Sequence, residues 1–228
     1  MKYQVRPAWR FARAHMGVER LKKQADTRLD QPEELVSLLF RFADSELKPF
    51  QIDEELASLA KEVRDLSPMN VLEIGTAKGG TLFLWTRLAQ RDAVIVSIDL
   101  PGGKFGGGYS NRRATIYRRF ARKGQQLHLM REDSHAQATF EKAKQLFGEK
   151  PVDLLFIDGD HTYEGVKRDW EMYSQLVRAG GLIVFHDIAG NYDDTQVKRL
   201  WDSIKSDYKY REYAVHPDGL YGIGVLVK

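Results

Sequence analysis

Ionisable side chains follow two apolar runs in the C-terminal half of the chain, and each run is typical of a buried strand. Asp158 and His161 stand in I-D-G-D-H after the first run, and His186 and Asp187 end the second in F-H-D. The carboxyl ends of parallel strands meet at one edge of an open sheet, so we expect these four side chains to share one pocket. Burying ionisable groups without partners is costly, so packing alone explains the grouping poorly.

A bound cation would explain this grouping, and the composition limits its chemistry. The 228 residues include no cysteine, which excludes disulfides, thiolate metal sites and a thiol nucleophile. Oxygen and imidazole ligands suit magnesium or manganese. A hydroxyl beside such a cation has a lowered pKa, and His161, three residues after Asp158, is placed to remove its proton. Asp160 is a fallback oxygen ligand, or otherwise a turn residue.

The segment 70–81, N-V-L-E-I-G-T-A-K-G-G-T, predicts a strand, a tight glycine turn and a helix. Unpaired N–H groups at the start of such a helix favour a nucleotide-like ligand. The spacing G-x-A-x-G-G is wrong for the G-x-G-x-x-G fingerprint of dehydrogenases. E-x-G-x-A-x-G resembles the first motif of class I methyltransferases that use S-adenosylmethionine (SAM), although an ordinary βα turn has the same form. By this resemblance the loop and its acid hold the amino-acid end of the cofactor: Glu73, Gly75, Thr76 and Gly79.

Two further acids are candidates for the rest of the cofactor. Asp99 ends the expected strand 93–99, about 20 residues past the glycine turn, where it can accept hydrogen bonds from both ribose hydroxyls. This spacing fits NAD equally well, and Asp99 could instead cap the next turn. By the same methyltransferase resemblance, Asp133 receives the adenine amino group and the backbone of Ser134 faces the ring. Either residue could instead be a helix N-cap.

A second resemblance covers residues 50–228 and rests on I-D-G-D-H-T-Y-E-G-V and G-G-L-I-V-F-H-D. These motifs resemble the metal-dependent O-methyltransferases related to the cephalosporin hydroxylase-like and macrocin-type sugar enzymes, and more distantly catechol O-methyltransferase. The resemblance implies that Asp158 and Asp187 are metal ligands and that His161 is the base. His186 departs from these relatives, which more often carry Asp or Glu; it can ligate manganese, and it weakens the case for magnesium. The implied reaction moves a methyl group from SAM to a hydroxyl of a small molecule or sugar.

The order of apolar runs predicts an α/β fold, a Rossmann-like methyltransferase sheet of five parallel strands with helices on both faces. The short link between the expected strands 211–215 and 222–227 favours a terminal antiparallel hairpin. Class I methyltransferases resemble this arrangement, whereas dehydrogenases commonly continue in parallel. We expect residues 1–50 to form a helical arm, as a lid or a contact in a homo-oligomer, and residues 51–228 to form the SAM-binding domain.

Composition and charge narrow the class of partner. With 43% hydrophobic and 29% charged residues and no apolar run long enough for a membrane span, the chain is expected to be soluble and cytoplasmic. A net charge of +3 is small, and the chain lacks the N/D-P-P-Y motif of amino-group methylases, so we expect no nucleic-acid partner. Basic clusters at 1–23 and 112–123 keep a nucleic-acid methyltransferase as the alternative, beside a non-catalytic SAM-binding subunit. The glycine-rich segment 101–110 is a gating loop or a plain connector.

Overall fold

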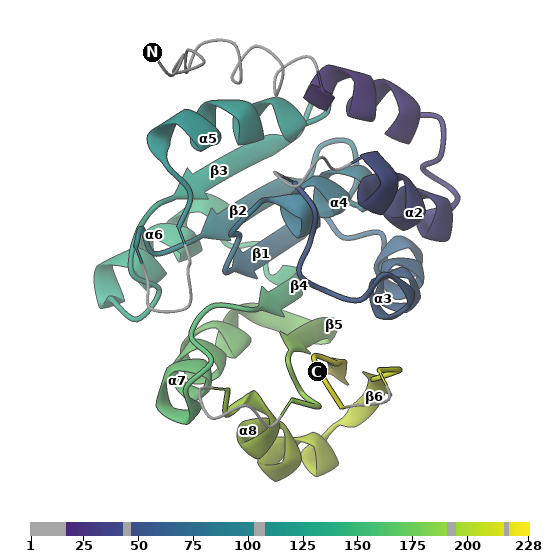
Figure 1. The fold of residues 1–228 in the computed structure, drawn as a ribbon. Coiled ribbons are helices and arrows are strands. Elements are labelled where there is room, and N and C mark those ends of the chain that lie inside the picture. Colours follow the sequence, from purple (N-terminus) through teal and green to yellow (C-terminus); the bar gives the residue numbers. More distant parts are fainter. Residues whose placement is uncertain (1–16, 43–46, 103–107, 191–194, 217–218) are drawn as a thin grey trace, which may run out of the picture.

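One seven-stranded sheet, in the order β3-β2-β1-β4-β5-β7-β6, runs through the middle of the computed structural model (Figure 1). The structure describes residues 17–42, 47–102, 108–190, 195–216 and 219–228. The first five strands are parallel, and β7 lies antiparallel between β5 and β6. The strands are β1 Asn70–Ile74, β2 Val94–Ile98, β3 Gln126–Met130, β4 Val152–Ile157, β5 Val177–His186, β6 Lys209–Tyr213 and β7 Ile223–Val227. The predicted fold class, with its terminal antiparallel hairpin, is therefore confirmed.

Helices cover both faces of this sheet (Figure 1). They are α2 Pro32–Phe42, α3 Asp53–Leu66, α4 Gly80–Leu88, α5 Asn111–Tyr117, α6 Gln137–Phe147, α7 Tyr163–Tyr173 and α8 Val197–Ile204, with 3-10 turns at Arg118–Phe120, Ser174–Leu176 and Lys205–Asp207. Residues 17–25 are also helical. No helix in the described ranges is both long enough and apolar enough to cross a membrane.

Strand side chains alternate between two separate cores, as the period of two in a β-strand requires. In β4, Leu154 and Phe156 pack with α2, α3, α4 and α5, whereas Leu155 and Ile157 pack with α6, α7 and α8. Both faces of the central strands are buried, which explains why their sequences are continuously apolar rather than alternating. The two cores fix the strand tips from which the polar residues emerge.

The N-terminal arm joins the first of these cores over the part that is described. Val18, Leu21 and Leu39 are buried in this core, helix α2 packs on α3 and α4, and Arg87 of α4 donates to Asp26 at 2.6 Å. Residues 1–16 and 43–46 lie outside the described part, and so does most of the first basic cluster. The division into an arm and a domain at residue 50 stays a prediction.

Some element boundaries differ from those that the sequence suggests. The strand expected at 211–215 is β6, Lys209–Tyr213. Helix α6 begins at Gln137 rather than directly after Ser134, because Asp133 accepts hydrogen bonds from the N–H groups of His135 and Ala136 and so holds a turn. Strand β5 ends one residue before Asp187, whose backbone has a φ of +64°. Residues 103–107 of the glycine-rich segment lie outside the described part, so its role as a gate or a connector stays a prediction.

Candidate active site

A pocket of about 490 Å³ opens at the carboxyl ends of β1, β2, β4 and β5. This edge is where open α/β sheets bind ligands, and the volume is in the range usual for small-molecule sites. Polar residues at or just beyond the ends of these strands and of β3 contribute to its wall: Asp99, Asp133, Ser134, Asp158, Asp160, His161, His186 and Asp187. The four groups expected to share a pocket therefore do share one.

The glycine turn after β1 is shaped by close backbone packing. Gly75 has a φ of +87°, and a Cβ placed on it would lie 1.9 Å from the carbonyl oxygen of Asp158. Only glycine allows β1 and β4 to approach so closely at their ends. Gly79, also at positive φ (+80°), precedes α4 and packs against the ring of Tyr117, whose hydroxyl donates to the carbonyl of Ala77 at 2.9 Å.

Glu73 lies beneath this turn and does not line the pocket. It is fully buried, and it accepts hydrogen bonds from the hydroxyl of Thr76 and from the indole N–H of Trp85, both at 2.8 Å. Burial raises the pKa of Glu73 to about 8, against the hydrogen bonds that stabilise its charged form. Its direct role in this structure is to anchor the loop to α4 from below.

Asp99 ties the same loop to β2. Its Oδ2 accepts from the backbone N–H groups of Thr76 at 3.1 Å and Ala77 at 2.7 Å, and burial raises the pKa of this carboxyl. Its position in the pocket wall is compatible with the ribose contact expected from the sequence. Asp133 and Ser134 also line the pocket; the hydroxyl of Tyr173 holds the carbonyl of Ser134 at 2.8 Å.

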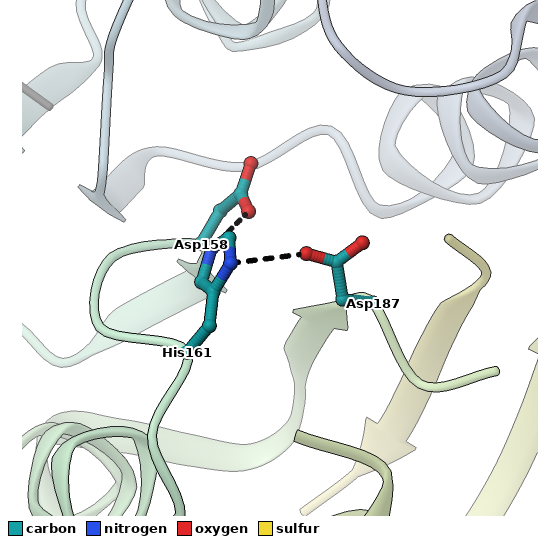
Figure 2. A group of neighbouring side chains, drawn as sticks. All are labelled: Asp158, His161 and Asp187. Carbon is teal, nitrogen blue, oxygen red and sulfur yellow. Dashed lines mark ion pairs between the residues drawn. The ribbon is translucent and has the colours of Figure 1, made fainter. Parts of the chain in front are cut away.

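Asp158, His161 and Asp187 form an Asp–His–Asp cluster at the other end of the pocket (Figure 2). The imidazole of His161 lies between the two carboxylates, 3.4 Å from Oδ1 of Asp158 and 3.3 Å from Oδ2 of Asp187. One donor atom from each residue lies within 4.8 Å of the other two, a spacing that a metal ion can bridge. His161 precedes α7, which begins after an N-cap in which Thr162 accepts from the N–H of Gly165.

His186 also faces the two aspartates, and its predicted role as a ligand stays a prediction. Its Nδ1 lies 3.1 Å from Oδ1 of Asp158 and 3.4 Å from Oδ1 of Asp187, while its Nε2 is buried without a hydrogen-bond partner among the described residues. Its ring stacks on Tyr221, with centroids 5.9 Å apart. The structure therefore places both histidines beside the two aspartates.

Opposite charges balance one another in this corner of the pocket. Burial by itself would raise the pKa of Asp158, but the positive charge of His186 and hydrogen bonds from both histidines lower it well below its ordinary value. Burial likewise favours neutral histidines, yet the two aspartates outweigh it and raise the pKa of His161, and that of His186 further. These shifts favour the charged form of Asp158 and the protonated form of both histidines.

Two features of the cluster were not visible in the sequence pattern. The side chain of Gln51, buried just before α3, donates from Nε2 to Oδ2 of Asp158 at 2.7 Å. Asp187 has a φ of +64°, an uncommon conformation for a non-glycine residue and one that concentrates at functional sites. Asp160 accepts from the N–H of Thr162 at 2.8 Å, as a turn residue does.

Comparisons with known proteins agree with this architecture. A family model described as a methyltransferase domain matches residues 72–188. The chain is 30% identical over 175 residues to the uncharacterized protein R132 of Acanthamoeba polyphaga mimivirus, covering 75% of each. It is 27% identical over 145 residues to the uncharacterized protein y4gI of Sinorhizobium fredii, where the match spans 62% of this chain and 16% of that protein.

Solved O-methyltransferases share the fold. TomG from Streptomyces achromogenes, in complex with SAM, superposes with a TM-score of 0.57 at 16% identity, over 87% of this chain and 90% of that one. The enzyme from Bacillus cereus, in complex with SAH, gives a TM-score of 0.55 at 16% identity, over 92% and 100%. The family match covers more than half of the 228 residues, and the chain therefore belongs to this methyltransferase-domain family.

Proposed function

We propose that the protein is a SAM-dependent O-methyltransferase that acts on a hydroxyl of a small molecule or sugar, with a divalent cation and His161 as the base. The observation that carries the proposal is the Asp–His–Asp cluster in the wall of the pocket that the glycine turn also lines. One part of the pocket fits a cofactor, and the other fits an alcohol that must lose a proton. Family membership and the O-methyltransferase neighbours support the reaction class.

The residues around the glycine turn fit SAM. Gly75 and Ala77 line the pocket without large side chains, and Asp99 presents a carboxylate there. Asp133 and Ser134 line the same pocket, in keeping with the adenine contacts expected from the sequence. When bound, SAM supplies a methyl group on a positively charged sulfur. The chain would orient that methyl by holding both ends of the cofactor, through the loop and through Asp99.

The Asp–His–Asp cluster also fits a divalent cation. The carboxylates of Asp158 and Asp187 are an oxygen donor pair, suited to manganese and to magnesium, and they leave His161 for proton transfer. A cation bound there would supply positive charge that lowers the pKa of a nearby hydroxyl. Nδ1 of His186 lies 3.1 Å from Asp158 and 3.4 Å from Asp187, so this ring offers a nitrogen ligand beside the two carboxylates.

His161 would take the proton of the acceptor hydroxyl. Asp158 and Asp187 hold its ring from both sides, and this fixes its orientation toward the pocket and stabilises the imidazolium that forms. Positioning an oxygen nucleophile beside the methyl group gains on the order of 7 to 11 kcal/mol in well-oriented pairs, and proton removal contributes about 10² to 10⁴ in rate.

Calorimetry and methyl transfer test this function together. We expect SAM and S-adenosylhomocysteine to bind the wild-type protein, and manganese to bind at the cluster and to raise methyl transfer to hydroxylated acceptors. Asp187→Asn should lose manganese binding, while Asp202→Asn, an exposed α8 residue paired with Lys198, should retain it. SAM binding without transfer to any hydroxylated acceptor would favour the non-catalytic subunit instead, and no SAM binding would overturn the proposal.

A further inference from the structure

A second pocket, of about 520 Å³, adjoins the first. Phe50 and Tyr221 line both pockets, so the two hollows meet at these rings. Gln51 also lines the second pocket, and its amide reaches Asp158 at 2.7 Å. A ligand with a hydroxyl at the Asp–His–Asp cluster therefore has room to extend past Phe50 and Tyr221 into the second pocket.

The two pockets differ in charge. The first carries five aspartates in its wall, whereas the second is lined by two lysines, Lys48 and Lys78. Its one carboxylate among the described lining residues, Asp53, accepts from the neighbouring backbone N–H of Glu54 at 3.1 Å and so faces its own helix end. The first pocket also holds three histidines, His135, His161 and His186, but its aspartates outnumber them, so the two lysines favour an anionic group in the second pocket.

Both ammonium groups are held over aromatic rings. Nζ of Lys78 lies 4.4 Å from the centroid of Phe50, and Nζ of Lys48 lies 5.5 Å from that of Phe40. Among the described residues neither lysine forms an ion pair, so the three N–H donors of each are available to a ligand. Phe50 itself is 56% exposed, which is unusual for a large apolar side chain at the mouth of two pockets.

We propose that the second pocket binds an oxyanion, a carboxylate or a phosphate, carried by the acceptor whose hydroxyl lies at the Asp–His–Asp cluster. The inference rests on the proposed function and specifies its substrate class: an anionic molecule with a flat apolar body that passes between Phe50 and Tyr221. Lysines act as point charges and accept either oxyanion without demanding bidentate geometry. The lysines would also set which hydroxyl of the acceptor faces His161, because they would hold the anionic end of the acceptor in the second pocket.

Binding of small aromatic probes tests the inference without any methyl transfer. The probes are 4-hydroxybenzoate, phenyl phosphate and the neutral 4-hydroxybenzamide, measured by ligand-observed NMR in the absence of cofactor. We expect at least one anion to bind about fivefold tighter than the amide, and this advantage to shrink at high salt. The double variant Lys48→Gln, Lys78→Gln should lose the advantage. Lys144→Gln, which removes the same charge from the exposed face of α6, should keep it.

The comparison of the two anions identifies the source of the oxyanion, because the better ligand indicates a carboxylate or a phosphate acceptor. Equal binding of the amide, an advantage that survives the double variant, or no binding of either anion at about 10 mM would each overturn the inference. A parallel titration with S-adenosylhomocysteine separates this result from the proposed function. Cofactor binding with no anion preference leaves the methyltransferase in place and removes only the anionic subsite.

Discussion

Replacing Gly75 by alanine gives the sharpest test of how the two halves of the site are joined. The new Cβ would lie 1.9 Å from the carbonyl oxygen and 2.4 Å from the carbonyl carbon of Asp158, and 2.8 Å from the backbone nitrogen of Gly159. All three atoms belong to backbone rather than to the end of a flexible side chain, so the overlap can be relieved only by separating β1 from β4. That movement would displace Asp158 from the Asp–His–Asp cluster.

Two terms set the size of the effect. Placing a non-glycine residue at a φ of +87° costs about 1 to 2 kcal/mol, and overpacking against fixed atoms costs about 1 to 3 kcal/mol more. Gly102→Ala is the matched control, because Gly102 has a similar φ of +76° and, apart from its chain neighbours, no atom of the described residues lies within 4 Å of the place that its Cβ would take. Gly102→Ala should therefore be destabilised only by the cost of the positive φ, about 1 to 2 kcal/mol.

Urea denaturation of both variants measures the difference in unfolding free energy. Gly75→Ala should be destabilised by about 2 to 5 kcal/mol, with the excess over Gly102→Ala equal to the overlap term. Manganese titration should show weaker binding in Gly75→Ala alone, since only that variant displaces Asp158. Equal destabilisation of the two variants, with unchanged manganese affinity, would refute the argument that the β1–β4 contact positions the site.

Three further changes probe the site separately. His161→Ala should lower turnover about 10² to 10⁴-fold with little change in S-adenosylhomocysteine affinity; near-normal turnover would show that another group is the base. Because the pKa of Glu73 rises from 4.5 in the unfolded chain to about 8 in the folded one, its contribution to stability is complete below pH 4.5 and is lost as the pH rises through 8. The free energy of unfolding of the wild type should therefore fall over this pH range by at most on the order of 5 kcal/mol, and Glu73→Gln should reduce that fall. The same fall in both proteins, measured by urea denaturation, would exclude Glu73 as its origin. Gln51→Ala removes a hydrogen bond to the charged Asp158, so it should cost about 1.5 to 3 kcal/mol in urea denaturation, and an unchanged midpoint would contradict this.

Much of the fold follows from local patterns in the sequence. Continuous apolar runs marked β1, β2, β4 and β5 because these strands are buried on both faces, and the short link before Ile223 marked the hairpin. The sequence also predicted one pocket shared by Asp158, His161, His186 and Asp187, because the carboxyl ends of neighbouring parallel strands are adjacent. Their chemical roles stay predictions.

Contacts between side chains far apart in the sequence could not be predicted from local patterns. Gln51 lies 107 residues before Asp158 and sits in a segment whose pattern indicates only the start of a helix. The placement of His161 and His186 around the two aspartates depends on rotamers and on the positive φ of Asp187, which no periodicity encodes. The role of Gly75 was also understood only in part, since its closest neighbour is the backbone of Asp158 rather than open pocket.

Asp158 is held from three directions, and this arrangement couples the two ends of the pocket. Its backbone N–H donates to Ile74 at 2.8 Å and its carbonyl packs on Gly75, which ties it to the glycine turn. Its Oδ2 accepts a hydrogen bond from the amide of Gln51, and its Oδ1 faces His161 and His186. Packed backbone transmits small displacements because it has no free volume in which to absorb them. A ligand that shifts the glycine turn must therefore shift a carboxylate of the Asp–His–Asp cluster, and cofactor and cation should bind with mutual effect on affinity, equal in both directions by linkage.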